Sequence, residues 1–401
     1  MLGKVNRSDL FVLLWVLYYM QGTLYTSTII NQFIQVIMAT WLLIVFFSAI
    51  TNSNNPKLIK STSALFIMYL VYGLLNIMWG QEFVIAYRVP KYFYLQKAIN
   101  SLLPITLFYY YSRKGCITEE RIRVYFFVFL ITSLVLFNKE SIHMYEISNV
   151  DQGGVTNNAG YGMLALIPMV FFFYKKPFIQ YVLLAFILSF VLLGAKRGAI
   201  LIAAICALYF IVSSFRNSKR RNYAFILGFV FICIGYYYFD HIFSTNEFLV
   251  SRYEQTMEGD SSNRDILYGN VWNAFLHNSS LLQQLIGHGA DSTLKIMGAF
   301  AHQDWLEIVY NNGLVGVFLF VMFFVSYIIN IKDARHSLPK WLIQAFVTIL
   351  IIGFLKTLFS AFICQIELYM SLVIGYTLAE LTKYSSSNTG INGNARTKLH
   401  N

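Results

Sequence analysis

Charged side chains are scarce in this chain of 401 residues. Asp, Glu, Lys and Arg together make up 12% of it, about half of their usual share in soluble domains. Acidic residues are the scarcer sign, 19 against 30 basic residues, while hydrophobic residues reach 57%. This composition excludes an ordinary water-soluble enzyme.

Cysteine is also rare. The four cysteines lie in separate segments, without the close pairs that bind zinc, so they predict neither a zinc site nor a disulfide framework. The formal charge of +11 is not gathered on one tail or one helix face. It therefore does not indicate a nucleic-acid partner, and none is expected.

Long apolar runs are what the chain does have. Runs near 20 residues predict an all-α, polytopic integral membrane protein with about twelve transmembrane helices, and no alternating barrel pattern occurs. The expected spans cover residues 9–27, 29–50, 62–80, 94–111, 124–138, 159–174, 178–194, 199–215, 223–239, 311–331, 341–359 and 362–382. We expect one transmembrane domain over residues 1–382, with a large outer loop at 241–304 between spans 9 and 10. A disordered cytoplasmic tail is expected at 383–401.

The distribution of basic residues predicts that both termini are cytoplasmic. With that orientation, 20 of the 30 Lys and Arg residues fall on the inner side, as the positive-inside rule requires. The outer side receives ten: Arg88, Lys91, Lys97, Lys139, Lys196, Arg197, Arg252, Arg264, Lys295 and Lys356. Topology alone does not explain these ten, so they are candidates for binding.

Two outer cations, Lys196 and Arg197, lie in a hinge of small residues between two apolar spans, with the sequence Gly-Ala-Lys-Arg-Gly-Ala. A cation between two helix ends at a membrane surface usually has a partner.

The large outer loop carries a third cation of interest, Arg264. Ser262-Asn263-Arg264-Asp265 is typical of a helix start, and Tyr268, Trp272, Phe275 and Leu276 continue at helical spacing. We expect a helix on the membrane surface whose apolar stripe packs against the spans. Arg264 would lie in its first turn, where anions are favoured, or be a solvated surface arginine.

Two histidines of the same loop stand out. His288 lies in a glycine-flanked turn, Gly287-His288-Gly289, and His302 precedes the next apolar helix. A neutral imidazole at His302 could accept a proton from a hydroxyl group, or it could be a capping or interfacial histidine. Asp304 and Glu307 either orient that imidazole or are polar residues at the headgroup boundary.

Taken in order, these motifs resemble a known family. They are similar to motifs of the O-antigen ligase and polymerase superfamily. The motifs are the Lys-Arg hinge, the Asn-Arg and Trp of the loop helix, Gly-His-Gly, and the His-x-x-x-Leu-Glu start of the last motif. The likeness is greatest to the Wzy-type polymerases of bacterial surface polysaccharides. It covers roughly residues 155–330, whereas the first 150 residues match only in hydropathy.

The resemblance implies a fold akin to the C-type glycosyltransferases. No Asp-x-Asp pair is expected on the outer side to hold a divalent ion, so we expect no metal or other cofactor, and attack opposite the leaving group would give inversion. The resemblance also implies that Arg197 and Arg264 hold the pyrophosphate of an undecaprenyl-pyrophosphate-linked oligosaccharide, and that His302 activates the acceptor hydroxyl. Lys196 stands where many relatives have a small residue. The secondary substrate-binding candidates are Lys196, Arg88, His288, Asp304 and Trp272.

The expected location is the inner membrane of a bacterium, with the site on the periplasmic side. The expected partners are the lipid-linked oligosaccharide, the bilayer, a chain-length regulator and a flippase, and the product is O-antigen or capsular polysaccharide. A ligase that moves the finished glycan to lipid A core or protein would use the same motifs. A flippase is less favoured, because charges within the spans are few.

Overall fold

The computed structural model describes residues 5–51, 54–84, 88–148, 159–217 and 264–397, together with isolated positions between 226 and 254. Several expected features lie outside the described residues. They are most of the ninth span, most of the first half of the outer loop, Arg252, and the helix-start residues Ser262 and Asn263.

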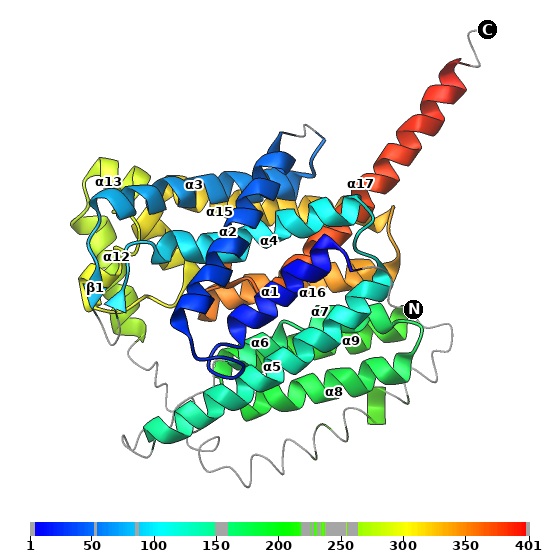
Figure 1. The fold of residues 1–401 in the computed structure, drawn as a ribbon, viewed down its shortest axis with the longest axis horizontal. Coiled ribbons are helices and arrows are strands. Elements are labelled where there is room, and N and C mark those ends of the chain that lie inside the picture. The colour runs from blue at the N-terminus through cyan, green and yellow to red at the C-terminus, as the bar shows by residue number, and fades with distance from the viewer. Residues whose placement is uncertain are drawn as a thin grey trace.

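The described chain is almost wholly helical (Figure 1). Its longer helices are α1 Arg7–Tyr19, α2 Thr28–Ile50, α3 Lys57–Trp79, α4 Phe93–Arg113, α5 Glu119–Ser148, α8 Pro177–Leu193, α9 Arg197–Asn217, α12 Arg264–His277, α15 Asp304–Arg335, α16 Lys340–Phe359 and α17 Leu368–Thr397. The shorter ones are α6 Ala159–Leu164, α7 Ile167–Val170, α13 Leu281–Ile286 and α14 Leu294–Met297, with 3-10 turns η1 Phe171–Phe173 and η2 Ile363–Gln365. One antiparallel pair, β1 Phe83–Val84 and β2 Arg88–Val89, is the only sheet among the described residues.

Six of the described helices are long and apolar enough to cross a membrane: α2, α3, α5, α9, α15 and α16. The surface of α2 supports this assignment, because Ile29, Phe33, Val36 and Phe47 are all more than half exposed. A soluble protein rarely leaves so broad an apolar face in water, whereas lipid is a suitable solvent for it. The chain is therefore an all-α membrane protein.

Two expected spans have a different form in the structure. The span expected at 159–174 is divided into α6, α7 and η1, with Pro168 in the first turn of α7, where its missing N–H can be tolerated. The helix α1 ends at Tyr19 rather than near 27 and is followed by a turn with Gly22 at φ 83°. The helix α17 extends to Thr397, and no proline follows Pro339 to interrupt it; the disorder expected of residues 383–401 stays a prediction.

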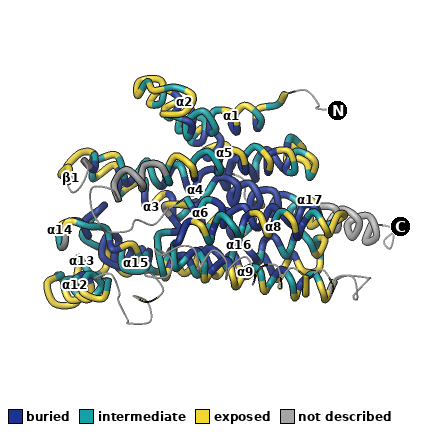
Figure 2. Tube along the Cα trace, turned by 90° about the horizontal axis from the view of Figure 1, so that it is seen from below, coloured by how far each residue is buried: buried dark blue, intermediate teal, exposed yellow. Residues whose placement is uncertain are grey.

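The centre of the bundle is formed by α4 and the first half of α17, which pack along each other (Figure 2). Gly375 allows this close approach, since a Cβ there would lie 2.5 Å from the backbone nitrogen of Tyr109. The residues of α4 from Ser101 to Tyr109 are all buried.

The two ends of the helix bundle contain different elements. The loop end, as we call it, holds the β pair and α12 to α14, and the two chain termini lie toward the opposite, terminal end (Figures 1 and 2). At the terminal end, the Asn6 side chain donates to the Cys116 carbonyl oxygen at 2.6 Å, which ties the start of α1 to the α4–α5 turn. At the loop end, the Asn76 side chain donates to the Lys91 carbonyl oxygen at 2.9 Å.

Candidate functional site

Arg264 joins the first turn of α12 to the end of α16. Its Nη1 donates a hydrogen bond to the carbonyl oxygen of Phe359 at 3.2 Å. Phe359 is the last residue of α16, and Ser360 beyond it is extended. The last carbonyls of a helix carry partial negative charge, so a guanidinium is stabilised there.

The helix α12 is held at the loop end by a stripe that only partly agrees with the expected one, since Phe275 belongs to both. Val271 and Phe275 are buried against α14 and α15 in a small second core that includes Ala301 and Val309. Trp272 is not part of that core and is 47% exposed. The predicted packing stripe is therefore wrong at Trp272 and at Leu276, which is also exposed.

Arg197 is the first residue of α9, directly after Lys196 and the turn residue Ala195, whose φ is 51°. The next residue, Gly198, lies against two other elements. A Cβ at Gly198 would lie 3.0 Å from the Cβ of Phe359 and 2.5 Å from the Tyr161 hydroxyl. The start of α9 therefore meets the end of α16, at the same residue, Phe359, that Arg264 contacts.

His302 lies on the link from α14 to α15, two residues before α15 begins, with φ 53°. Its position is set by Glu307, one turn into α15. Glu307 Oε1 accepts from the backbone nitrogen of Ala301 at 2.5 Å, and its Oε2 accepts from Thr293 Oγ1 at 2.7 Å. A half-buried carboxylate thus holds the backbone immediately before the imidazole.

Three cations from separate elements act on His302. Partial burial lowers the pKa of this histidine below its usual value, and the charges of Lys196, Arg264 and Lys97 lower the pKa further. A lowered pKa keeps the imidazole neutral at physiological pH, which is the form that can accept a proton. The side chain still has exposed surface, so a ligand can reach it.

The side chains of Asp304 and His288 make contacts that hold segments of the protein together. Asp304 is 4% exposed, and its Oδ2 accepts from the backbone nitrogens of Phe362 and Ile363 at 2.6 and 3.0 Å. This carboxylate fixes the link between α16 and α17 instead of facing a substrate or the imidazole of His302.

His288 lies in the glycine-flanked turn that the sequence predicted, with Gly287 at φ 80° and Gly289 at φ 101°. The ring of His288 stacks on Tyr310 at 4.3 Å, and its Nε2 is 2.7 Å from Ser279 Oγ. Its backbone nitrogen donates to the Tyr310 carbonyl oxygen at 2.9 Å. Gly313 has non-helical dihedral angles and interrupts α15. The backbone nitrogens of His288 and Gly289 donate to carbonyl oxygens of α15 just before this break. The contacts assign His288 a structural role.

Replacement of Gly287 by alanine is expected to destabilise the protein by about 3 kcal/mol or more, because only glycine adopts its backbone conformation readily. The new Cβ would also lie 2.3 Å from the Asn311 carbonyl oxygen. Gly298→Ala is the matched control, since Gly298 also has a positive φ of 65° but has no atom within 4 Å of a built Cβ. Its expected cost is about 1 kcal/mol. Thermal unfolding of the two variants in detergent measures the difference, and equal melting temperatures would contradict the assigned packing of the turn.

Arg88 lies in β2, at the loop end with the other candidates, but its side chain is outside the described part of the chain. Lys97 is a site residue that motif analysis missed. Its Nζ lies 4.0 Å from the ring centre of Phe93 and 4.1 Å from that of Phe300, two residues before His302. The only sequence signal for Lys97 was its place among the ten outer cations, because α4 contains none of the quoted motifs.

Lys356 was likewise one of the ten outer cations. It is 4% exposed in the last turn of α16, with Nζ 3.4 Å from the Gln365 carbonyl oxygen and 5.1 Å from the ring centre of Tyr161. Lys356 is thus a basic residue in the same last turn of α16 as Phe359, whose carbonyl oxygen Arg264 contacts.

Within the described residues, no three His, Cys, Asp or Glu side chains gather as a metal site. Lys196, Arg264 and Lys97 place positive charge around His302, while Asp304 and Glu307 are bonded to backbone nitrogens. Such a site suits a ligand that carries several negative charges next to a hydroxyl group.

The chain was compared with known proteins in two ways. No protein-family model matches it, and no curated protein matches it either.

Proposed function

We propose that this protein is a glycosyltransferase of the bacterial inner membrane that joins lipid-linked oligosaccharide repeat units into a surface polysaccharide. In this proposal the substrates are undecaprenyl-pyrophosphate-linked oligosaccharides, and the product is O-antigen or capsular polysaccharide. The supporting observation is that three segments far apart in the sequence meet near His302. Arg264 and Gly198 both lie against Phe359, and Lys97 lies against Phe300, two residues before the histidine. The charges of Lys196, Arg264 and Lys97 lower the pKa of His302.

The cations suit the leaving group of this reaction. As the anomeric carbon separates from the pyrophosphate, negative charge builds up on the phosphate oxygens. Arg264 and Arg197 would stabilise that charge, since a guanidinium can bind two phosphate oxygens at once. Arg264 donates to the Phe359 carbonyl oxygen, an acceptor that a phosphate oxygen could replace.

His302 would act as the general base. The acceptor hydroxyl oxygen forms a bond to the anomeric carbon, its proton passes to the neutral imidazole, and the carbon–oxygen bond to the pyrophosphate breaks with its electron pair. Attack from the face opposite the leaving group inverts the anomeric configuration. Glu307 would be a positioning residue, because it holds the backbone of Ala301.

The proposed orientation places the loop end in the periplasm and the terminal end in the cytoplasm. Cations at the α4–α5 turn and at the ends of α15 and α16 support it, among them Arg113, Lys114, Arg335 and Lys340. These residues are on the side that the positive-inside rule assigns to the cytoplasm. The proposed site would then face the periplasm, where the chain-length regulator and the flippase would be neighbours in the membrane.

A ligase that transfers the glycan to lipid A core or to protein is the second candidate, because the same cations and base would serve it. A flippase needs neither a base nor a fixed pyrophosphate position. The neutral, exposed His302 therefore favours a transferase over a flippase.

Incubation of the purified protein with lipid-linked repeat units alone is expected to give a ladder of extended glycans. A ligase would give no ladder without its own acceptor, and a flippase would give none at all. Addition of EDTA is expected to change the rate less than about twofold, since cationic side chains replace the metal in this mechanism. Loss of the ladder in EDTA, restored by magnesium, would overturn the metal-free mechanism.

A further inference from the structure

A polar cavity of about 250 Å³ lies between α1, α4 and the start of α17, and Lys97 is one of the residues that line it. Tyr18 and Tyr19 line it from α1, Gln96, Lys97 and Asn100 from α4, and Glu367 from the residue before α17. We refer to it as the α1–α4 cavity. None of the sequence motifs lies in it.

The lining of the α1–α4 cavity has the chemistry of a site for an uncharged sugar. Hydroxyl and amide groups come from Tyr18, Tyr19, Gln96 and Asn100, and the ring of Phe93 also lines the wall. Amides and hydroxyls can both donate to and accept from sugar hydroxyls, while aromatic rings pack on the apolar faces of a ligand. One lysine and one glutamate leave the lining without net charge. The volume is below the range of about 300–1,000 Å³ for drug-sized ligands, so a single sugar ring is the appropriate size.

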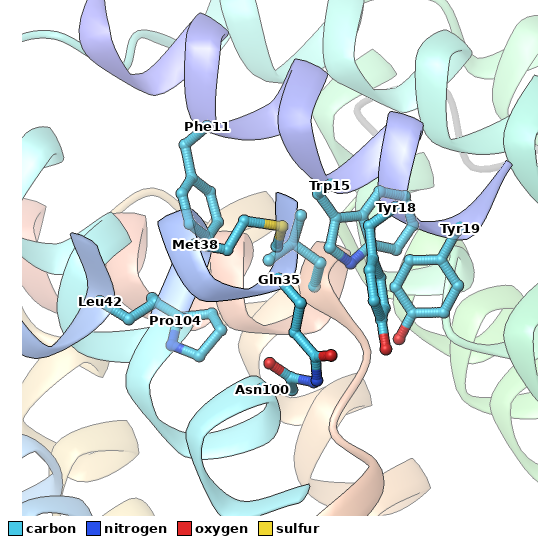
Figure 3. Close-up of a pocket in the computed structure, with 10 residues that line it drawn as sticks. Phe11, Trp15, Tyr18, Tyr19, Gln35, Met38, Leu42, Asn100 and Pro104 are labelled. Atoms are coloured by element: carbon cyan, nitrogen blue, oxygen red, sulfur yellow. The ribbon is translucent and has the colours of Figure 1, made fainter. Parts of the chain in front are cut away.

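The deeper side of this region is closed. A neighbouring pocket shares Tyr18, Tyr19 and Asn100 with the cavity, but its free volume is only about 10 Å³. Figure 3 shows the amides of Gln35 and Asn100 next to each other, with Phe11, Met38, Leu42 and Pro104 filling the space above and beside them. That volume is at the lower limit for one water molecule. Of these two adjoining spaces, a sugar therefore fits only the α1–α4 cavity.

Lys97 connects the cavity with the proposed reaction centre. It lines the cavity, and its ammonium group lies between the rings of Phe93 and Phe300. Phe300 is two residues before His302 on the same link. Arg264 lies at the start of α12 and contacts the end of α16, and its charge also lowers the pKa of His302. Lys97 thus relates His302 to the cavity, while Lys196 and Arg264 relate it to the residues proposed for the pyrophosphate.

We propose that the α1–α4 cavity binds the acceptor saccharide, an uncharged sugar whose hydroxyl group passes its proton to His302. This inference rests on the glycosyl-transfer function proposed above and adds the position and chemical class of the second substrate. The amides of Gln96 and Asn100 orient the sugar ring, and Tyr19 donates to one of its hydroxyls.

Saturation-transfer NMR on the full chain in lipid nanodiscs tests the site directly, with free glucose, galactose, N-acetylglucosamine and rhamnose as probes. At least one probe is expected to bind. Tyr19→Phe and Asn100→Leu are each expected to weaken that binding by about two- to tenfold, the effect of one lost hydrogen bond to an uncharged partner. Tyr92→Phe is the matched control, because Tyr92 is 53% exposed next to α4 and does not line the cavity.

Absence of binding for all four probes, or equal binding to wild type, Tyr19→Phe and Asn100→Leu, would overturn the saccharide site. The chain-extension assay separates this inference from the function on which it rests. Sugar binding without a ladder would overturn the polymerase and keep the saccharide site. A ladder that forms at the wild-type rate in both cavity variants would overturn the acceptor site alone.

Discussion

Replacing His302 with glutamine is expected to lower the rate of chain extension by about 10²–10⁴-fold, the usual contribution of a general base. Binding of the lipid-linked donor should change little, because the proposed pyrophosphate contacts are made by Arg197 and Arg264. The wild-type rate should fall only below pH 6.5, since burial and three cations lower the pKa of His302 and protonation removes the base. This acidic limb should disappear from the residual activity of the variant. Single-turnover rates across pH, together with a carrier-lipid binding assay, measure both effects.

His277→Gln is the matched control for this substitution. His277 is an exposed histidine at the end of α12, at the same end of the bundle, and extension by this variant should equal that of wild type. Equal loss in both variants, or an unchanged acidic limb in His302→Gln, would exclude His302 as the base.

Replacing Arg264 with alanine is expected to lower extension by about 10²–10³-fold, the range for loss of one donor that stabilises charge in a transition state. The variant should still insert in the membrane, because α12 is held by Val271 and Phe275. Arg264→Lys should recover only part of the rate, since an ammonium group keeps the charge but not the bidentate geometry. Rates are measured in the ladder assay, and folding by size-exclusion chromatography in detergent.

Lys295→Ala is the control for loss of positive charge at the loop end, because Lys295 is exposed on α14. Extension by Lys295→Ala should remain within about twofold of wild type, as expected for a solvated charge. If Arg264→Ala retained the wild-type rate while properly folded, the proposed pyrophosphate contact would be wrong.

Most of the helical segments could be predicted from hydropathy, because a helix in lipid must satisfy its backbone polar groups locally. The expected spans at 29–50 and 341–359 agree with α2 and α16 within one residue. The prediction was poorer for α6 and α7. A proline near the middle of an apolar run signals a break, but whether the helix resumes depends on what packs around it. Six helices satisfy the length and hydropathy of a span, whereas twelve spans remain a prediction.

The face of α12 that packs could not be predicted from spacing. The sequence has apolar residues on both sides of this helix, at Trp272 and at Val271. A helix at a membrane surface can expose large apolar residues on one side while it buries others. Periodicity then indicates a helix without indicating which stripe contacts the protein.

By itself, the sequence determined that this chain folds in lipid as helices and that its cations are uneven along the chain, because hydropathy and charge are local properties. Only the tertiary structure decided that Lys97 belongs beside His302 and that Asp304 and His288 serve the packing. Those assignments depend on which helix ends meet at the loop end. These contacts join residues that are far apart in the chain. They follow from how whole helices pack against one another, and a local sequence pattern does not encode that packing.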